Sequence, residues 1–120
     1  MKIAFSTSGK DVGAPLDMRF GRAANFLVYD TGSGAFEIVP NTQNLNAVQG
    51  AGIQAAQHVA GSGAEAVVCG HCGPKAFAVL KAAGIRVYTC EAATVSNALK
   101  AFREGTLKEL PQPDVAGHWA

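Results

Sequence analysis

The segment at residues 65–69 is the feature of this sequence that most constrains the fold. Glu65–Cys69 is a mostly apolar, β-branched run without polar–apolar alternation, as expected of a strand that is covered on both faces. Pro74 follows shortly and suits the first turn of a helix, to which Phe77 and Leu80 give an apolar stripe. A doubly covered strand that leads into a helix indicates an α/β protein.

The rest of the chain extends this pattern. Further strands are predicted at Lys2–Ser6, Phe26–Asp30, Ala35–Val39 and Ile85–Thr89, and further helices at Val48–Ala60 and through Val95, Leu99 and Phe102. The sequence Thr-Gly-Ser-Gly at residues 31–34 predicts a hairpin between the second and third strands. Strands that are linked through helices should be parallel, with right-handed crossovers.

These elements predict a three-layer α/β/α fold with a five-stranded mixed sheet. We expect the strand order 3-2-1-4-5, with strand 2 antiparallel to its hairpin neighbours. Residues 1–105 are expected to form one domain, and residues 106–120, with Pro111 and Pro113, a loose tail. The loops at residues 7–20, 41–50, 70–74 and 89–94 then leave one edge of the sheet, where open α/β folds usually bind ligands.

Composition narrows the classes of function. The chain has 120 residues, of which 48% are hydrophobic and 16% charged, and this favours an ordered globular protein. A formal net charge of +1 gives no strong field for nucleic acid or a membrane surface, and no apolar run is long enough to cross a bilayer. The first residues lack the apolar stretch of a signal peptide, so we expect a cytoplasmic protein. In that compartment three cysteines favour metal or redox chemistry over structural disulfides.

Two thiols and an imidazole lie within four residues, where the buried strand gives way to a helix. Cys69, His71 and Cys72 are soft or borderline ligands that suit zinc, copper and iron–sulfur species, and Cys90 ends the neighbouring strand on the same side. A four-ligand metal site is therefore possible. Two alternatives stay open: a thiol-redox pair, since Cys-x-x-Cys at a helix start supports disulfide exchange, and buried cysteines that are chemically inert.

Cys-Gly-His-Cys also matches the active-site tetrapeptide of protein disulfide isomerases. Those domains carry an aromatic residue just before the first cysteine and a cis-proline loop that faces it later in the chain. Here Val68 precedes Cys69, and no proline occurs between Pro74 and Pro111. We therefore rank metal binding above thiol–disulfide exchange.

The first loop contains two arginines, in the sequence Asp17-Met18-Arg19-Phe20-Gly21-Arg22. Their guanidinium groups can offer planar arrays of donors to an anion, and Lys75 adds positive charge at the same edge. The alternative is that these arginines pair with Asp17 or Asp30 and simply close the loop.

The segment at residues 41–52 is rich in amides and glycine, including Asn44 and Gly50. Amides and bare backbone N–H groups at a helix start favour negatively charged ligands. The alternative is a well-capped loop that binds nothing. The acidic residues are scattered, which weighs against hydrolytic and nucleic-acid chemistry.

Three stretches together resemble the dinitrogenase iron–molybdenum cofactor biosynthesis family, which includes NifX-like proteins, the C-terminal domain of NifB-like proteins and small orange-protein-like members. The matching stretches are Asp17-x-Arg19-Phe20-Gly21-Arg22 with Phe26 and Asp30, the helix start Gly50-Ala51-Gly52, and Gly73-Pro74-Lys75-Ala76-Phe77 leading to Leu80 and Ala83-Gly84-Ile85. They occur in the order typical of the family and cover residues 1–105.

The resemblance implies a ribonuclease-H-like fold without nuclease activity, in a protein that binds or carries an anionic metal–sulfur cluster for cofactor assembly or storage. The cluster would be of the iron–sulfur, molybdenum–iron–sulfur or molybdenum–copper–sulfur type. The residues expected to hold it, beside the metal ligands named above, are Arg19, Phe20, Gly21, Arg22, Asn44, Gly50, Gly73 and Lys75.

We expect no enzymatic activity, a cluster-assembly or acceptor protein as partner, and a monomer or weak dimer. The Cys-Gly-His-Cys segment is an addition in this member and favours direct ligation of the metal by thiolates. A thiol–disulfide oxidoreductase and a metal-independent regulatory module are the alternatives.

Overall fold

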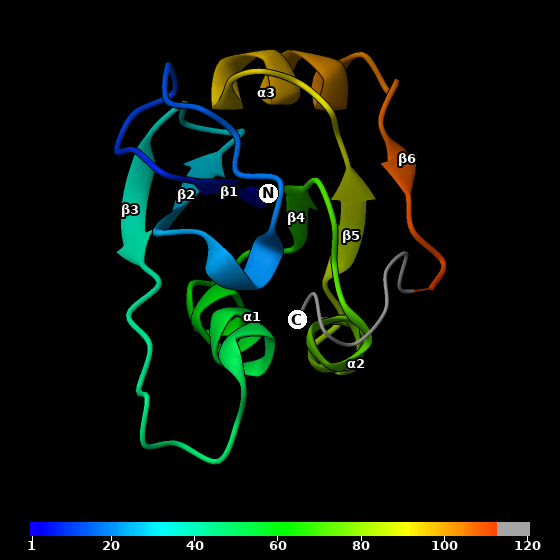
Figure 1. Cartoon of the computed structure of the whole chain (residues 1–120). Helices are drawn as coiled ribbons and strands as arrows, with labels where there is room; N and C mark the ends of the chain where they lie inside the picture. Colours follow the sequence, from blue (N-terminus) through cyan, green and yellow to red (C-terminus); the bar gives the residue numbers. More distant parts are fainter. Residues whose placement is uncertain (113–120) are drawn as a thin grey trace.

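The chain folds around one mixed β-sheet, shown in Figure 1. The computed structural model describes residues 1–112. The strands are β1 Lys2–Thr7, β2 Asn25–Asp30, β3 Phe36–Pro40, β4 Ala66–Cys69, β5 Arg86–Thr89 and β6 Lys108–Glu109. Their order in the sheet is 3-2-1-4-5-6. Strands β1, β4 and β5 are mutually parallel, and β2 is antiparallel to both β1 and β3, so the predicted order of the first five strands is confirmed.

The prediction of five strands was wrong by one. Lys108 and Glu109, which were assigned to a loose tail, pair antiparallel with Thr89 and Tyr88 as β6. Leu110 continues this contact, because its backbone N–H donates to the carbonyl of Val87 at 2.8 Å and its side chain is buried. The remainder of the predicted tail, residues 113–120, lies outside the described residues.

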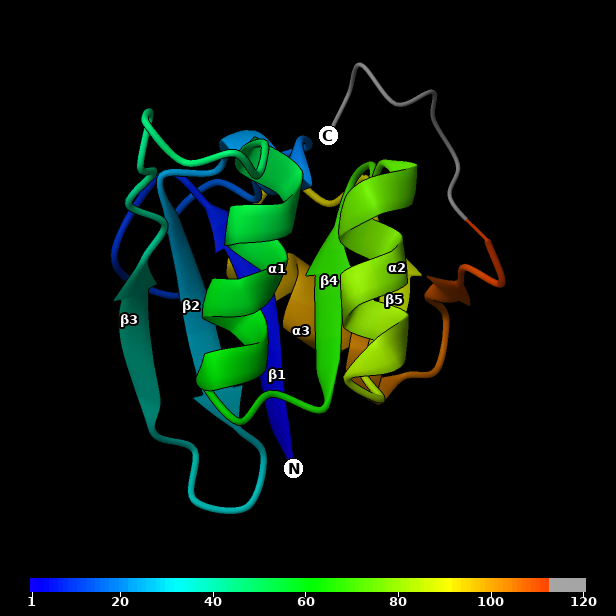
Figure 2. The ribbon, with the colours of Figure 1, turned by 90° about the horizontal axis from the view of Figure 1, so that it is seen from below.

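Helices cover both faces of the sheet, as Figure 2 shows. Helices α1, Ala51–Gly61, and α2, Pro74–Ala82, lie side by side on one face, and α3, Val95–Arg103, lies on the other. Successive side chains of β1 point to opposite faces of the sheet, and the core is therefore divided into two clusters, one on each face. Ala4 packs in the cluster that includes α1 and α2, whereas Ile3 and Phe5 pack in the cluster that includes α3. None of the helices within residues 1–112 is both long and apolar enough to span a bilayer.

Helix α1 begins three residues later than predicted. Val48 was expected to begin the helix, but it is fully exposed in the preceding loop. Gly50 occupies the N-cap position instead, and its extended backbone leads into Ala51. The predicted hairpin at residues 31–34 is confirmed, with Gly34 in the left-handed region at φ +77°.

The topology brings four loops to one edge of the sheet. Because β1, β4 and β5 are parallel, their carboxyl ends meet there, and the loop after β3 joins them. Helices α1 and α2 both start at this edge, since each runs back toward the start of the next parallel strand. This edge is where the candidate site is built.

Candidate functional site

The loop after β1 is fixed to the sheet by two buried hydroxyl groups. Ser6 Oγ donates to the carbonyl of Asp17 at 2.7 Å, and Thr7 Oγ1 donates to the carbonyl of Pro15 at the same distance. Both hydroxyl side chains have no exposed surface. Hydrogen bonding of these buried polar groups therefore sets the position of the residues that follow.

A close backbone contact joins this loop to the loop after β4. The N–H of His71 donates to the carbonyl of Met18 at 2.7 Å, and the N–H of Phe20 donates to the carbonyl of His71 at 3.3 Å. Between them, Gly70 lies so near that an added Cβ would stand 2.6 Å from the Met18 carbonyl oxygen and 2.7 Å from its Cα. Only glycine permits this approach without a backbone shift.

This contact places a short 3₁₀ helix, η1, Phe20–Arg22, which the sequence did not reveal. The Phe20 ring is buried and packs on Phe26, with ring centroids 5.1 Å apart. Gly21 is also buried, whereas Arg22 is exposed. The buried ring thus anchors η1 against α1 and leaves its arginine at the surface.

Neither arginine of the first loop is neutralised by a carboxylate within residues 1–112, where no ion pair involves Arg19 or Arg22. Asp17 instead uses its Oδ1 to accept the backbone N–H of Arg19 at 2.9 Å, which shapes the turn. The alternative in which these arginines pair with Asp17 or Asp30 is therefore wrong. Both guanidinium groups stay exposed at the edge.

A hollow of about 470 Å³, here named the α1 hollow, opens between η1 and the start of α1. It is lined by residues 21–23, by most of the loop at 41–51, and by Gln54. These described lining residues include Arg22 but no aspartate or glutamate. The first turn of α1 also carries no acidic residue, and Gly50 has no side chain with which to cap it. Gly50 and Ala51, at the uncapped and positively polarised start of α1, therefore line the α1 hollow together with Arg22.

Side-chain amides brace the wall of the α1 hollow. Asn41 is buried, and its Nδ2 donates to the carbonyl of Ala23 at 2.8 Å. Gln54 Oε1 accepts the backbone N–H of Asn44 at 2.7 Å, while its Nε2 donates to the carbonyl of Gln49 at 2.9 Å. The amides of this segment therefore hold the loop in shape, and the backbone and Arg22 are left to face a ligand.

Helix α2 presents a second start at the same edge. Its N-cap is Gly73, no side chain of the described residues caps it, and its first turn has no acidic residue. Lys75 in this turn is exposed. Because α1 and α2 pack side by side, their positive ends lie on the same side of the molecule (Figure 2).

The structure separates the predicted metal ligands. Cys69 and Cys72 have no exposed surface and pack in the cluster with α1 and α2, whereas Cys90, 9% exposed, packs in the cluster with α3. His71 is half-buried. Within residues 1–112 no three His, Cys, Asp or Glu side chains gather in a way that could hold a metal ion. The four residues predicted as one ligand set are thus not assembled as such.

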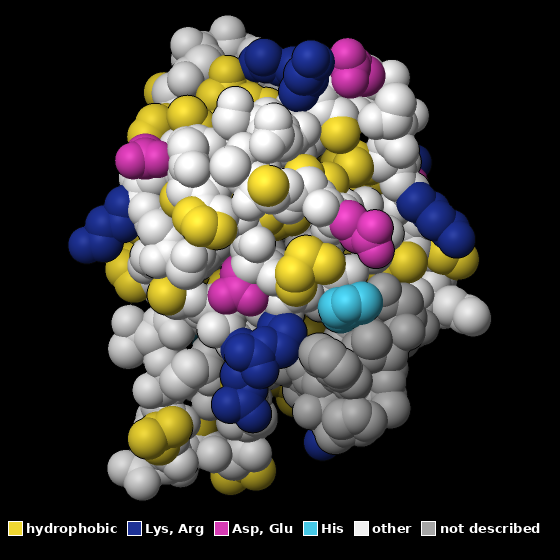
Figure 3. All heavy atoms as spheres, turned by 45° about the horizontal axis from the view of Figure 1, so that its top comes forward, with side chains coloured by type: hydrophobic (Ala, Val, Ile, Leu, Met, Phe, Trp, Pro, Cys, Tyr) yellow, Lys and Arg dark blue, Asp and Glu magenta, His cyan; other side chains and the backbone are white. Residues whose placement is uncertain are grey.

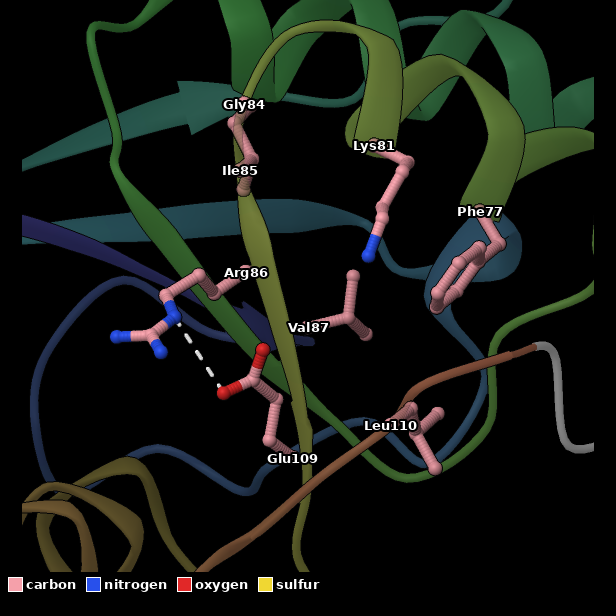
Figure 4. Close-up of a pocket in the computed structure, with 8 residues that line it drawn as sticks. All are labelled: Phe77, Lys81, Gly84, Ile85, Arg86, Val87, Glu109 and Leu110. Carbon is pink, nitrogen blue, oxygen red and sulfur yellow. Dashed lines mark ion pairs between the residues drawn. The ribbon is translucent and has the colours of Figure 1, made fainter.

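A different hollow lies at the opposite edge of the sheet and is drawn in Figure 4. Its volume is about 220 Å³, and Phe77, Val87 and Leu110 form its apolar wall. Arg86 and Glu109 pair at one side of it, with 3.3 Å between Nε and Oε1. None of the residues predicted for the site lines it, and it lies by the last turn of α2, where the helix end is negative.

The close contact between Met18 and Gly70 was not predicted from the sequence. The sequence signal for this contact was indirect. A glycine directly after a buried strand indicates a close backbone approach, but the partner becomes known only from the fold.

On the face in Figure 3 the Lys and Arg side chains are spread apart rather than joined in one basic patch, which agrees with the net charge of +1.

The family described as dinitrogenase iron-molybdenum cofactor matches residues 1–105. The chain belongs to this family. An uncharacterized protein of Methanocaldococcus jannaschii is 33% identical over 98 residues, which are 79% of this chain and 82% of that protein. The resemblance inferred from the three sequence stretches is thus confirmed.

Two solved structures of similar proteins support the same family membership. The apo form of the orange protein from Desulfovibrio gigas matches with a TM-score of 0.89 and 41% identity, over 95% of this chain and 96% of that one. A Thermotoga protein provisionally named as a NifB protein matches with a TM-score of 0.79 and 39% identity, over 91% and 92% of the two chains. This member of the dinitrogenase iron–molybdenum cofactor family is therefore similar in fold to both over at least 91% of its length.

Proposed function

We propose that this protein binds and carries an anionic metal–sulfur cluster at the carboxyl edge of the sheet. The observation that carries the proposal is the α1 hollow, where an α-helix starts without a side-chain cap beside an exposed arginine and without any carboxylate among the described lining residues. Such a helix start offers N–H donors and positive potential to an anion. Membership of a family named for the iron–molybdenum cofactor supports a metal–sulfur cluster as that anion.

The size and rim of the α1 hollow fit this cargo. Its volume of about 470 Å³ lies within the range of small-ligand pockets, which runs from about 300 to 1,000 Å³. Arg19 and Lys75 are exposed on the same edge and add positive charge around the entrance. A cluster of the iron–sulfur, molybdenum–iron–sulfur or molybdenum–copper–sulfur type meets the charge requirement.

The geometry supports ionic capture over the direct thiolate ligation that the sequence favoured. Cys69 and Cys72 have no exposed surface, so their sulfur atoms could reach a cluster only if the core between β4 and α2 opened. Arg22, Gly50 and Ala51, the first residue of α1, already line a hollow. We therefore assign capture to charge and backbone donors, with thiolate ligation as the competing mode that the test must separate.

The role we propose is binding and delivery rather than catalysis. The burial of Cys69 and Cys72 also supports this choice, because disulfide exchange requires a thiolate that a second thiol or disulfide can approach. An assembly or acceptor protein is the proposed partner. Leu45 and Val48, 93% and 102% exposed beside the α1 hollow, would supply apolar contacts at the point where the cargo is handed over.

The test is an anaerobic titration of the full chain with tetrathiomolybdate, followed by visible absorption at low and high salt. We expect saturable binding that weakens with salt through screening. Arg22→Ala should weaken it about tenfold, close to the roughly 1.5–3 kcal/mol of a charged hydrogen bond. Lys100→Ala, which removes an exposed positive charge from α3, is the matched control and should leave binding unchanged.

Two results would contradict the proposal. A wild-type protein that retains no visible absorption after desalting from tetrathiomolybdate, with or without added iron or copper, would reject cluster binding. Binding that survives Arg22→Ala at full strength but is lost in Cys69→Ser and Cys72→Ser would replace ionic capture by thiolate ligation.

A further inference from the structure

A second hollow at the carboxyl edge gathers soft metal ligands. This β5 hollow, of about 220 Å³, is lined by Met18, Gly70, His71, Thr89, Cys90 and Glu91. It shares no lining residue with the α1 hollow. Three of its six residues carry a thioether, an imidazole and a thiol, which are donors that soft metal ions prefer.

Backbone hydrogen bonds hold these three residues next to one another. The His71 N–H donates to the Met18 carbonyl at 2.7 Å, and the Cys90 N–H donates to the carbonyl of Cys69 at 2.9 Å, directly before Gly70. The Met18 Cε lies 2.6 Å from the place where a Cβ of Gly70 would stand. The Met18 thioether therefore lies over Gly70, which directly precedes His71 in the sequence.

Cys90 is the cysteine of this edge that a metal ion can reach. It is 9% exposed and lines a hollow, whereas Cys69 and Cys72 have no exposed surface. The backbone N–H of Ala92 points at its Sγ from 3.3 Å, and an N–H donor of this kind stabilises negative charge on sulfur. Glu91 adds a carboxylate that attracts cations, in contrast to the α1 hollow.

The donor set decides which metal would bind. No three His, Cys, Asp or Glu side chains within residues 1–112 gather to hold a metal ion, so the nitrogen, oxygen and thiolate sets typical of zinc are absent from the described residues. The third donor here is the Met18 thioether, which ligates soft ions such as copper(I) and adapts its position through three rotatable bonds. One thiolate also balances the charge of a monovalent ion.

We infer that Met18, His71 and Cys90 form a binding site for a single soft monovalent metal ion, of which copper(I) is the biological representative. The inference does not depend on the proposed function, because the two sites take ligands of opposite charge and share no lining residue. It gives the protein a cation site on the α3 side of the edge and an anion site beside α1.

The full chain, labelled with selenomethionine, can be titrated anaerobically with copper(I) in competition with bicinchoninate, and the adduct examined by X-ray absorption at the copper edge. We expect one tightly held ion and a copper–selenium distance in the spectrum. The sequence has two methionines, and Met18→Leu leaves only Met1, so loss of that distance in this variant assigns it to residue 18.

Affinity changes provide the second readout. Cys90→Ser should weaken copper(I) about a hundredfold and Met18→Leu about tenfold, as expected for loss of ligands or of groups that orient them. His58→Gln, on α1, is the control and should bind normally. Tetrathiomolybdate binding by Met18→Leu should stay at the wild-type level, which keeps a failure here distinct from a failure of the proposed function.

Either of two results would overturn the site. Copper(I) that is fully lost to bicinchoninate shows that no such site exists. Copper(I) that is retained without a copper–selenium distance, and lost in Cys72→Ser, places the metal on the buried cysteines instead. Thermal unfolding midpoints of all variants separate these outcomes from simple misfolding.

Discussion

The helices of this protein begin in two different ways. Helix α3 is capped by Thr94, whose Oγ1 accepts the N–H of Asn97 at 3.1 Å. Helices α1 and α2 begin after Gly50 and Gly73, which have no side chain to offer. Since α2 and α3 have the same length of nine residues, the difference is not one of helix size.

This contrast indicates that the start of α3 serves stability and that the start of α1 serves binding. At α3 a side chain satisfies one of the first N–H groups, so that helix end contributes to folding. At α1 no side chain of the described residues caps the corresponding groups, and Gly50 and Ala51 line the α1 hollow beside Arg22, where we propose that a ligand binds. The start of α1 is therefore the one to change if binding is to be altered, and the start of α3 if only stability is.

The largest effect on stability is expected at the backbone contact between Met18 and Gly70, which positions η1 beside α1. Gly70→Val would drive side-chain atoms into the Met18 backbone, which stands 2.6–2.7 Å from the added Cβ position. We expect the free energy of unfolding to fall by about 3 kcal/mol, the upper end for overpacking, together with loss of tetrathiomolybdate binding. Urea unfolding measures the first effect and absorption titration the second. Wild-type stability in Gly70→Val would show that the close contact is absent.

The next prediction concerns a substitution that adds a negatively charged cap to the start of α1. Gly50→Asp is sterically permitted, because no atom lies within 4 Å of the added Cβ and the backbone φ of −74° suits any residue. The new carboxylate should cap α1 and occupy its N–H groups, so tetrathiomolybdate binding should weaken at least about tenfold while stability rises by a few tenths of a kcal/mol. Gly50→Asn is the matched neutral control. Undiminished binding in Gly50→Asp would remove α1 from the site.

The reciprocal change is made at α3. Thr94→Ala removes the cap and should lower the free energy of unfolding by about 1 kcal/mol. Binding of tetrathiomolybdate should be unchanged, since Thr94 lines neither the α1 hollow nor the β5 hollow. If Thr94→Ala weakened anion binding as much as Gly50→Asp, the two helix starts would not differ in role.

The smallest expected effect lies in the hairpin, away from both helix starts. The backbone N–H of Gly32, 2.8 Å from Oδ1, holds the pKa of Asp30 below its usual value of 3.8. A lowered pKa in the folded state means that this carboxylate stabilises the protein above about pH 4 and loses that effect as the pH falls through the folded-state pKa. Asp30→Asn should slightly flatten the acid limb of the thermal stability profile, measured between pH 2 and 7, and leave anion binding unchanged. An identical acid limb in wild type and variant would contradict it.

The parallel core of the fold could be predicted from the sequence, but its edges could not. The buried run at residues 65–69 and the turn at 31–34 determine the order of the first five strands, because each has a strong local pattern. Strand β6 has only the charged residues Lys108 and Glu109, which pair through their backbones and give no apolar signal. The start of α1 was placed three residues too early, at Val48, which is exposed in the loop before the N-cap residue Gly50.

The candidate site was predicted in part. Arg22 and the glycine- and amide-rich segment around Gly50 were predicted from local sequence, although the helix was expected to begin at Val48, and the structure brings them together around the α1 hollow. The cysteines were grouped by sequence proximity and by strand ends, but the direction in which each side chain points depends on strand register. That register sends Cys69 toward α1 and α2, and the chain after β5 places Cys90 on the α3 side.

The central claim is that an anionic thiometallate is captured at the start of α1. The most direct measurement is the perturbation of backbone amide signals in nitrogen-15-labelled protein as tetrathiomolybdate is added. We predict that the largest shifts fall on residues 21–23 and 50–52, with smaller shifts at Lys75 and none at Asn97. Largest shifts at residues 81–87, or at Cys69 and Cys72 with residues 50–52 unmoved, would contradict capture at the α1 hollow.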